Sequence, residues 1–495
     1  MLNCTAQGPA KSRSLSLSRH RHDLMQTNFF NTDTICAIAT PHGMGAIALV
    51  RVSGPHAIPI VSQLFMQNGN PFDIGKMVAN RAYYGHIVDH GAMLDEVLVT
   101  FFCAPHSFTG EDSAEISVHG SVYVQQKILQ VLIAHGCRMA EAGEFTRRAF
   151  VNRKFDLAQA EAIADLISSE NEAAHRIAIN QLKGGFSKEL QVMRSKLLEI
   201  TSLIELELDF SEEDVEFADR SQLKALLEDT LAQVTRLKES FRLGNAIKNG
   251  IPVAIVGQTN TGKSTLLNAL LGEDRAIVSD IAGTTRDTIE ETLNINGILY
   301  RFIDTAGLRN TDETIEKIGI ERSYKKISEA NVVIGMLDVT SGYESIISSA
   351  YEILGKLDFQ HQQLILCINK VDTLSDQGEA LLGKLRLDLD NDDVMVICLS
   401  AKHGFGLDEL YNTLKINQPL ASPDATMVTN VRHYQALLHA SESLKSVQQG
   451  LEIGIPIDLI SQDLRQALYY LGNITGEITT DEVLGTIFSR FCIGK

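Results

Sequence analysis

The strongest constraint on this chain is a glycine-rich stretch, Gly257 to Ser264, between an apolar run and a helix-like run. The stretch reads G-x-x-x-x-G-K-S, follows Ile251 to Val256 and precedes residues 265–270. Its glycines let backbone N–H groups and the next helix N-terminus point at a polyphosphate, while the lysine places a positive charge near the β and γ oxygens. The sequence therefore predicts a strand, a phosphate-binding loop and a helix of an α/β nucleotide-binding domain.

The predicted loop supplies the first group of candidate site residues. The Ser264 hydroxyl is a candidate Mg²⁺ ligand, and Lys263 is a catalytic candidate because phosphoryl transfer depends mainly on positioned charge. The expected nucleotide contacts here are Asn260, Thr261, Gly262, Lys263, Ser264 and Thr265.

Two later segments predict the switches of a phosphoryl-transfer site. Residues 300–303 read as a strand that ends in Asp304, whose carboxylate can hold Mg²⁺ through water, and the Gly307 amide can meet the γ-phosphate. The loop 279–287 offers a threonine hydroxyl to complete the Mg²⁺ shell; we favour Thr285, with Thr284 as the alternative. The expected nucleotide contacts in these segments are Ser279, Thr284, Thr285, Asp304, Thr305, Ala306 and Gly307.

The base is predicted from two apolar runs that end in polar motifs. Residues 364–368 lead into Asn369, Lys370 and Asp372, and a carboxylate such as Asp372 accepts hydrogen bonds from two guanine N–H donors that adenine lacks. Residues 394–399 lead into Ser400, Ala401 and Lys402, the expected closing loop over the base. Four motifs in order, each after a strand, predict a GTP-binding domain.

Hydrolysis needs a residue that orients the attacking water. Leu308, not glutamine, follows Gly307, so another residue must orient the water. Asp312, Glu313 and Glu316 are the candidate acids; equally, acids are common in the first turn of a helix.

Length and composition bound the rest. With 495 residues, 44% of them apolar and 21% charged, the chain is expected to form about three domains of an ordinary globular protein. A formal net charge of −18 argues against nonspecific binding of nucleic acid through the overall field, so any RNA contact is expected to be local or shared. Seven cysteines without zinc or disulfide spacing favour a reducing compartment.

The first 24 residues are rich in basic and serine residues. They are compatible with a mitochondrial or plastid transit peptide, but we favour an upstream misread start before Met25, and a cytoplasmic protein.

The expected fold class is multidomain α/β, with an inserted Ras-like P-loop GTPase domain. Short β-like runs and turn signals up to residue 151 predict an α+β domain, and helical periodicity dominates from 153 to the GTPase and again from 431 to 491. We predict a disordered extension at 1–29, an α+β domain at 30–151, helical segments at 152–245 and 417–495, and the GTPase domain at 246–416.

From about residue 30 to its end, the chain closely resembles the MnmE (TrmE) family of tRNA uridine-modification GTPases. The resemblance is carried by residues 108–112 (FTGED), 143–150 (GEFTRRAF), 156–162 (DLAQAEA), 283–287 (GTTRD), 304–309 (DTAGLR) and 491–495 (FCIGK). It implies an enzyme that works with an FAD-bearing MnmG-type partner on certain tRNAs, adding an aminomethyl or carboxymethylaminomethyl group at C5 of the wobble uridine, position 34. It also implies a homodimer, and a heterotetramer with that partner.

The resemblance further implies cofactors and site residues. A reduced folate, 5-formyl- or 5,10-methylene-tetrahydrofolate, would donate the carbon in a folate-binding N-terminal domain; the matching positions are Arg51, Glu115, Lys154 and Lys495. K⁺ would take the place of an arginine finger, with ligands from Asn260, Ser279, Ile281 and Thr284. Glu316 would be the catalytic acid that orients water.

A second interpretation stays open. A ribosome-assembly or signalling GTPase that acts as a binding switch would share the GTP motifs, but it would not need Lys154 and Lys495 at a folate site.

Overall fold

The computed structural model describes residues 33–209, 220–272, 291–295, 298–303, 327–359, 362–374, 378–389, 394–416, 426–489, 491 and 494. By its internal contacts the chain divides into two units, the first formed by residues up to 156 with 479–495 and the second by residues 157–478. Among the described residues, no helix has the length and apolar character needed to cross a membrane.

The first unit is an α+β domain built on an eight-stranded sheet in the order β4-β3-β5-β6-β7-β2-β1-β8. Its strands alternate buried and exposed side chains, so one face packs on α2 and α3 in a single core. The elements are β1 Thr34–Ile38, β2 Ile47–Ser53, α2 Ala57–Leu64, β3 Phe65–Gln67, β4 Asn70–Pro71, η1 Ile74–Lys76, β5 Ala82–Asp89, β6 Ala92–Phe102, β7 Ser113–His119, α3 Val122–Ala134, β8 Cys137–Met139, α4 Glu144–Val151 and α17 Asp481–Phe488.

Helix α17 is close in space to α4, although more than 300 residues separate them in the sequence. A Cβ on Gly143 would lie 2.6 Å from the Phe488 carbonyl oxygen, so this approach requires glycine. Gly494 is similarly close to Ile38, where a Cβ would lie 2.2 Å from the carbonyl oxygen. We expected all of 417–495 in the helical part, whereas the structure groups 479–495 with the first unit.

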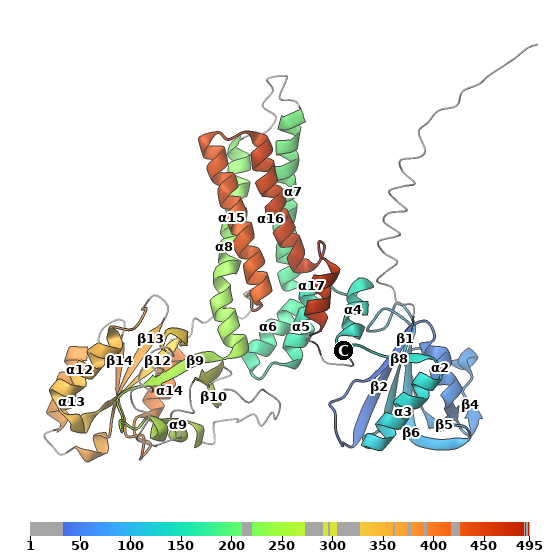
Figure 1. Ribbon diagram of the computed structural model, residues 1–495, viewed down its shortest axis with the longest axis horizontal. Coiled ribbons are helices and arrows are strands. Elements are labelled where there is room, and N and C mark those ends of the chain that lie inside the picture. Colours follow the sequence, from blue (N-terminus) through green and yellow to red (C-terminus); the bar gives the residue numbers. More distant parts are fainter. Residues whose placement is uncertain are drawn as a thin grey trace, which may run out of the picture. The chain divides into compact units, whose positions relative to one another are not determined.

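Outside its sheet domain, the second unit contains helices from two halves that are remote in sequence, and most of these helices share one apolar core (Figure 1). They are α5 Leu157–Ile167, α6 Glu172–Leu182, α7 Gly185–Asp209, α8 Arg220–Asn249, α15 Val431–Ile453 and α16 Ile457–Thr475. Helix α8 runs on to Asn249, so the expected boundary at 245 lies inside a helix; the turn follows at Gly250, whose φ is 83°.

The second unit also contains a six-stranded sheet in the order β10-β11-β9-β12-β13-β14, parallel except for the β10–β11 hairpin. Helices α9 and α14 contribute to the core on one face, and α12 and α13 to the core on the other. The elements are β9 Ile251–Val256, α9 Lys263–Gly272, β10 Glu291–Ile295, β11 Ile298–Phe302, β12 Val332–Asp338, η3 Val339–Ser341, α12 Tyr343–Leu354, β13 Gln363–Asn369, η4 Val371–Thr373, α13 Gly378–Leu389, β14 Val394–Cys398 and α14 Leu407–Ile416. The predicted α/β fold of the P-loop domain is confirmed.

Candidate GTP site and N-terminal charged site

The glycine-rich loop follows β9, at the point where the strand order reverses and ligands of open α/β sheets commonly bind. Gly257 and Gly262 have φ of 148° and 96°, a region that L side chains avoid. A Cβ on Gly257 would lie 2.4 Å from the Met336 carbonyl oxygen, and one on Gly262 would lie 2.2 Å from Asn369 Nδ2. Both glycines are therefore required by close packing as well as by backbone conformation.

Lys263 begins helix α9 and folds back over the loop. Its Nζ donates hydrogen bonds to the carbonyl oxygens of Gly257 at 2.9 Å and Gln258 at 2.7 Å, and burial lowers the pKa of this ammonium. Thr261 is buried and also donates to Gln258 O, at 2.9 Å. The loop is thus held by its own side chains, and its lysine charge lies at the start of a helix.

The strand that carries the guanine motif is tied to the phosphate loop by Asn369. Its Nδ2 donates to Thr261 O at 2.8 Å, while its Oδ1 accepts from the Ala401 backbone N–H at 3.0 Å. Asn369 is 3% exposed, so both bonds are shielded from water. One side chain therefore joins three predicted segments, the first of which lies more than 100 residues before the other two in the sequence.

Asp372 lies on the short helix η4 and is fixed from the closing loop. Ser400 Oγ donates to Asp372 Oδ1 at 2.5 Å, and His403 Nε2 lies 3.6 Å from Oδ2. The hydrogen bond from Ser400 holds the pKa of Asp372 below its usual value, so this carboxylate remains an acceptor at neutral pH. Such an acceptor suits the paired donors of guanine.

Asp338, at the end of β12, is a residue of this region that we did not predict from the sequence. Its Oδ2 accepts from Lys370 Nζ at 2.6 Å, and its Oδ1 accepts from the Thr340 backbone N–H at 2.9 Å. Thr340 Oγ1 also donates to Oδ1, at 2.7 Å, and although burial opposes ionisation, the bonds from Lys370 and Thr340 hold the pKa of Asp338 below its usual value. The signal in the sequence that could have identified Asp338 is its position at the carboxyl end of an apolar strand.

Several predicted residues fall outside the described part of the chain. They are Ser279, Ile281, Thr284, Thr285, Asp304, Thr305, Ala306, Gly307, Glu316 and Lys495. The described candidates Ser264 and Thr265 lie in the first turn of α9, Asn260 lies in the loop with φ of 62°, and Lys402 is exposed beside Ala401.

In the first unit, Arg51 and Glu115 are direct cross-strand neighbours on β2 and β7. Arg51 donates through Nε and NH2 to Glu115 Oε1, at 3.0 and 2.8 Å. The guanidinium also lies 4.9 Å from the centre of the Phe108 ring, within cation–π range. The structure thus brings together two of the four expected folate residues, and it adds an aromatic face that we had not selected, although Phe108 belongs to the quoted FTGED motif.

Lys154 is the third described residue of the expected folate site, and it directly precedes Phe155 in the sequence. Its Nζ donates to Pro105 O at 2.9 Å, and the neighbouring Phe155 ring lies 6.1 Å from Phe108. The described part of the chain holds no cluster of three or more metal-ligating His, Cys, Asp or Glu side chains.

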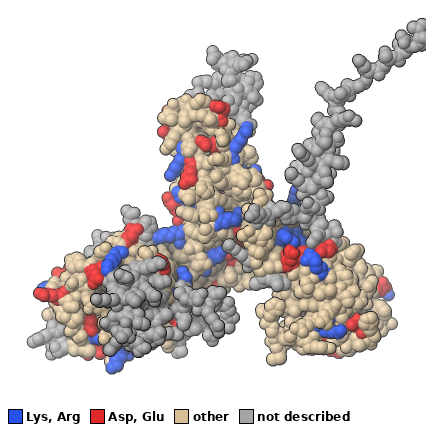
Figure 2. Space-filling model, viewed as in Figure 1, with Lys and Arg blue, Asp and Glu red and all other residues tan. Residues whose placement is uncertain are grey.

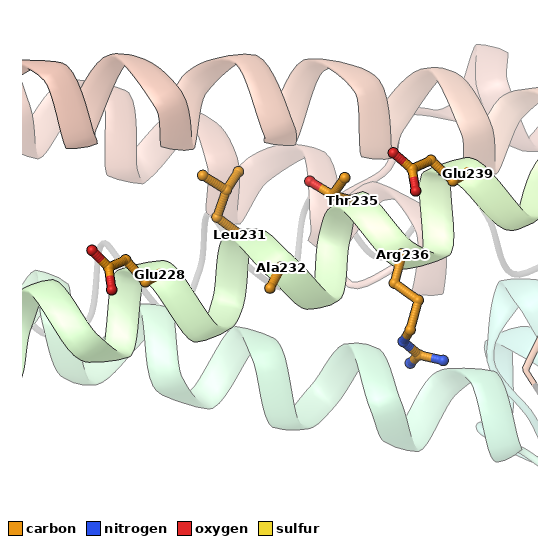
Figure 3. Close-up of a pocket in the computed structure, with 6 residues that line it drawn as sticks. All are labelled: Glu228, Leu231, Ala232, Thr235, Arg236 and Glu239. Atoms are coloured by element: carbon orange, nitrogen blue, oxygen red, sulfur yellow. The ribbon is translucent and has the colours of Figure 1, made fainter.

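A shallow pocket along α8 is separate from both groups. Figure 3 shows its lining side chains, which are Glu228, Leu231, Ala232, Thr235, Arg236 and Glu239. Leu231 and Thr235 rise toward one neighbouring helix pair, whereas Arg236 points to the opposite side, where it pairs with Glu189 of α7. None of the predicted site residues lines this pocket.

The surface charges agree with the sequence-based argument on nucleic acid. On the face shown in Figure 2, basic and acidic side chains of the described residues lie interspersed in small groups. That face therefore offers a nucleic acid local contacts and no extended basic surface among the residues that are described.

Two family models match the chain, the MnmE helical domain over residues 157–492 and the GTP-binding protein TrmE N-terminus over residues 34–154. A tRNA modification GTPase MnmE from Bacteroides fragilis is 50% identical over 94% of this chain and 100% of its own length. A tRNA modification GTPase MnmE from Flavobacterium johnsoniae is 52% identical over 94% of this chain and 100% of its own length. A solved structure of Era from Aquifex aeolicus covers 39% of this chain and 66% of its own at 29% identity, with a TM-score of 0.26 that supports no further conclusion.

Proposed function

The chain belongs to the MnmE family of tRNA modification GTPases, and from this membership we infer that it is a GTP-hydrolysing enzyme that acts in tRNA modification. The observation that carries the GTPase assignment is the Asn369 bridge, which joins the phosphate loop to the loop over the base. With Asp372 held by Ser400, it sets a guanine acceptor at a fixed distance from the phosphate loop.

The residues present fit a bound Mg²⁺–GTP. The two glycines leave no room for a Cβ where the loop packs, and the Lys263 ammonium can exchange its two carbonyl acceptors for phosphate oxygens. We propose Ser264 and Thr285 as Mg²⁺ ligands, since hard cations prefer oxygen donors. Bound Mg²⁺ would neutralise charge that develops on the phosphates.

We propose that Glu316 orients the attacking water and that Lys263 stabilises the transferred phosphoryl group. The proposed K⁺ ligands are Asn260, Ser279, Ile281 and Thr284, all of which offer side-chain or backbone oxygens. A potassium ion there would offset charge on the leaving phosphates.

For the carbon donor we propose a reduced folate at Arg51, Glu115, Lys154 and Lys495. The described part of this site supplies the Glu115 carboxylate, which suits the donor edge of a pterin, and the Arg51 guanidinium paired with it, which suits a neighbouring acceptor of the ligand. Arg51 uses Nε and NH2 on Glu115, and its NH1 is the nitrogen we assign to the ligand.

The finer activity we propose is addition of an aminomethyl or carboxymethylaminomethyl group at C5 of the wobble uridine, together with an MnmG-type FAD protein, by a homodimer that forms a heterotetramer with that partner. We place the protein in a reducing cytoplasm, because the five described cysteines are all free thiols.

The test is mass spectrometry of wobble-uridine nucleosides in tRNA from a deletion strain complemented with wild type or with Glu316→Ala. Restoration by wild type alone supports an enzyme whose GTP hydrolysis is required. Unchanged nucleosides in the deletion strain would contradict the proposal and favour a GTPase that acts only as a binding switch. Calorimetry of 5-formyltetrahydrofolate with wild type, Arg51→Met and Lys495→Ala tests the folate site, which is refuted if wild type produces no binding heat.

A further inference from the structure

Two segments join the six-stranded sheet to the helices. We call residues 240–249, at the end of α8, the exit crossing, and residues 426–432, which lead into α15, the return crossing. The crossings touch directly, because a Cβ on Gly244 would lie 2.3 Å from the Val428 carbonyl oxygen and the Val428 N–H donates to Ser240 Oγ at 3.1 Å. Any rotation of the inserted domain relative to the helices is therefore expected to move both segments together.

The hairpin of α5 and α6 holds both crossings. Asn171 Nδ2 donates to Ile247 O at 3.2 Å on the exit side, and Gln181 Nε2 donates to Met427 O at 2.9 Å on the return side. Ala174 of α6 is buried together with Ile247 and Met427 in one small apolar cluster. Backbone carbonyls of both crossings thus accept hydrogen bonds from side chains of one hairpin.

A single carboxylate bridges the two crossings. Asp165 Oδ1 lies 2.6 Å from Lys248 Nζ, and its Oδ2 accepts from Thr429 Oγ1 at 3.5 Å. One turn earlier on α5, Glu161 accepts from Asn430 Nδ2 at 3.0 Å and pairs with Arg432 at 2.6 Å. The two acids on this face of α5 therefore contact the segments through which the chain enters and leaves the inserted domain.

We propose that the α5–α6 hairpin is a clamp that couples the nucleotide state of the six-stranded domain to the helices, with Asp165 and Lys248 as its positioning pair. Lys248 lies three residues before β9, and β9 ends at the phosphate loop, so a shift of that strand reaches the carboxylate directly. Helix α6 leads through Gly184 into α7, whose apolar side chains form part of the shared core. The clamp rests on the proposed function, because it presumes that the phosphate loop binds GTP.

Hydrogen exchange of the full-length protein, with GDP and with a non-hydrolysable GTP analogue, tests the clamp. Lys248→Met keeps the length of the side chain and removes its charge, and Lys248→Arg keeps the charge. Lys196→Met is the matched control, since Lys196 pairs with Asp229 at 2.5 Å in the same helical part but away from both crossings. Calorimetric affinities for both nucleotides are measured first on every variant.

Wild type, Lys248→Arg and Lys196→Met are expected to change exchange at residues 157–182 by at least about fivefold between the two nucleotides, the lower end of ordinary allosteric coupling. Lys248→Met is expected to bind both nucleotides normally and to lose this difference. Normal GTP binding without any change of exchange in wild type, or a full change in Lys248→Met, overturns the clamp alone. Failure of wild type to bind GTP overturns the proposed function instead.

Discussion

Glu161 offers the sharpest test of how the two sequence halves of the helical part are held together. Its carboxylate accepts from Arg432 Nε at 3.0 Å and NH2 at 2.6 Å, and it lies 2.6 Å from His433 Nε2. Burial opposes ionisation, but His433 and Arg432 outweigh it and hold the pKa of Glu161 at about 2. Burial lowers the pKa of His433 and outweighs the opposing effect of the Glu161 carboxylate, which lies within hydrogen-bond distance of its Nε2.

The perturbation is Glu161→Gln, which keeps the shape and removes the charge. When folding lowers the pKa of a carboxyl from 4.5 to about 2, the ionised group adds about 3 kcal/mol to the free energy of unfolding at neutral pH, at roughly 1.4 kcal/mol per pH unit. Breaking a buried ion pair by removing one partner costs about 3 to 5 kcal/mol. The lower end applies here, because Arg432 keeps the carbonyls of Asn473 and Ile474 as acceptors.

The assay is hydrogen exchange of α5 and α15 in the full-length protein at pH 7. About 3 kcal/mol corresponds to exchange that is faster by roughly a hundredfold. Asp229→Asn is the control, since this exposed carboxylate accepts from Lys196 and Gln233 within the same helical part, and we expect no measurable change from it.

The pH dependence follows from the sign of the shift. A carboxyl whose pKa is lowered by folding stabilises the protein above its unfolded pKa of about 4.5, and this stabilisation is lost as the pH falls toward about 2. The difference in hydrogen exchange between wild type and Glu161→Gln should be the same at pH 7 and pH 5, and it should become smaller below pH 4.5. Equal exchange in the two proteins at pH 7, or a gap that does not narrow in acid, would refute this account.

Three further predictions concern the nucleotide site. Gly262→Ala should weaken GDP binding at least about thirtyfold, because its Cβ must displace Asn369 and a positive φ is strained, which together cost at least about 2 kcal/mol; calorimetry that finds equal affinity contradicts this. Asp372→Asn should lose about a hundredfold in affinity for GDP, since guanine keeps its two donors and loses their charged acceptor, and an unchanged titration would argue for another base contact. GTP turnover should be faster in KCl than in NaCl at equal ionic strength, and equal rates would remove potassium from the mechanism.

The sequence alone predicted the nucleotide site, because the chemistry of such a site lies in short contiguous motifs. The phosphate loop, the run from Asn369 to Asp372 and the run from Ser400 to Lys402 each follow an apolar strand, and strand order in an open α/β sheet places such ends together. The α+β texture of the first domain and the long helices after it were also visible, because burial imposes periods of two and of 3.6 residues.

Tertiary structure alone decided which distant residues meet. Periodicity shows which face of α5 is apolar, but not that Glu161 and Asp165 hold segments more than 250 residues later. The same holds for the link from Lys370 to Asp338, and for α17 against α4. These contacts depend on packing between elements that are remote in sequence, where the geometry of two surfaces, and no local preference, selects the partner.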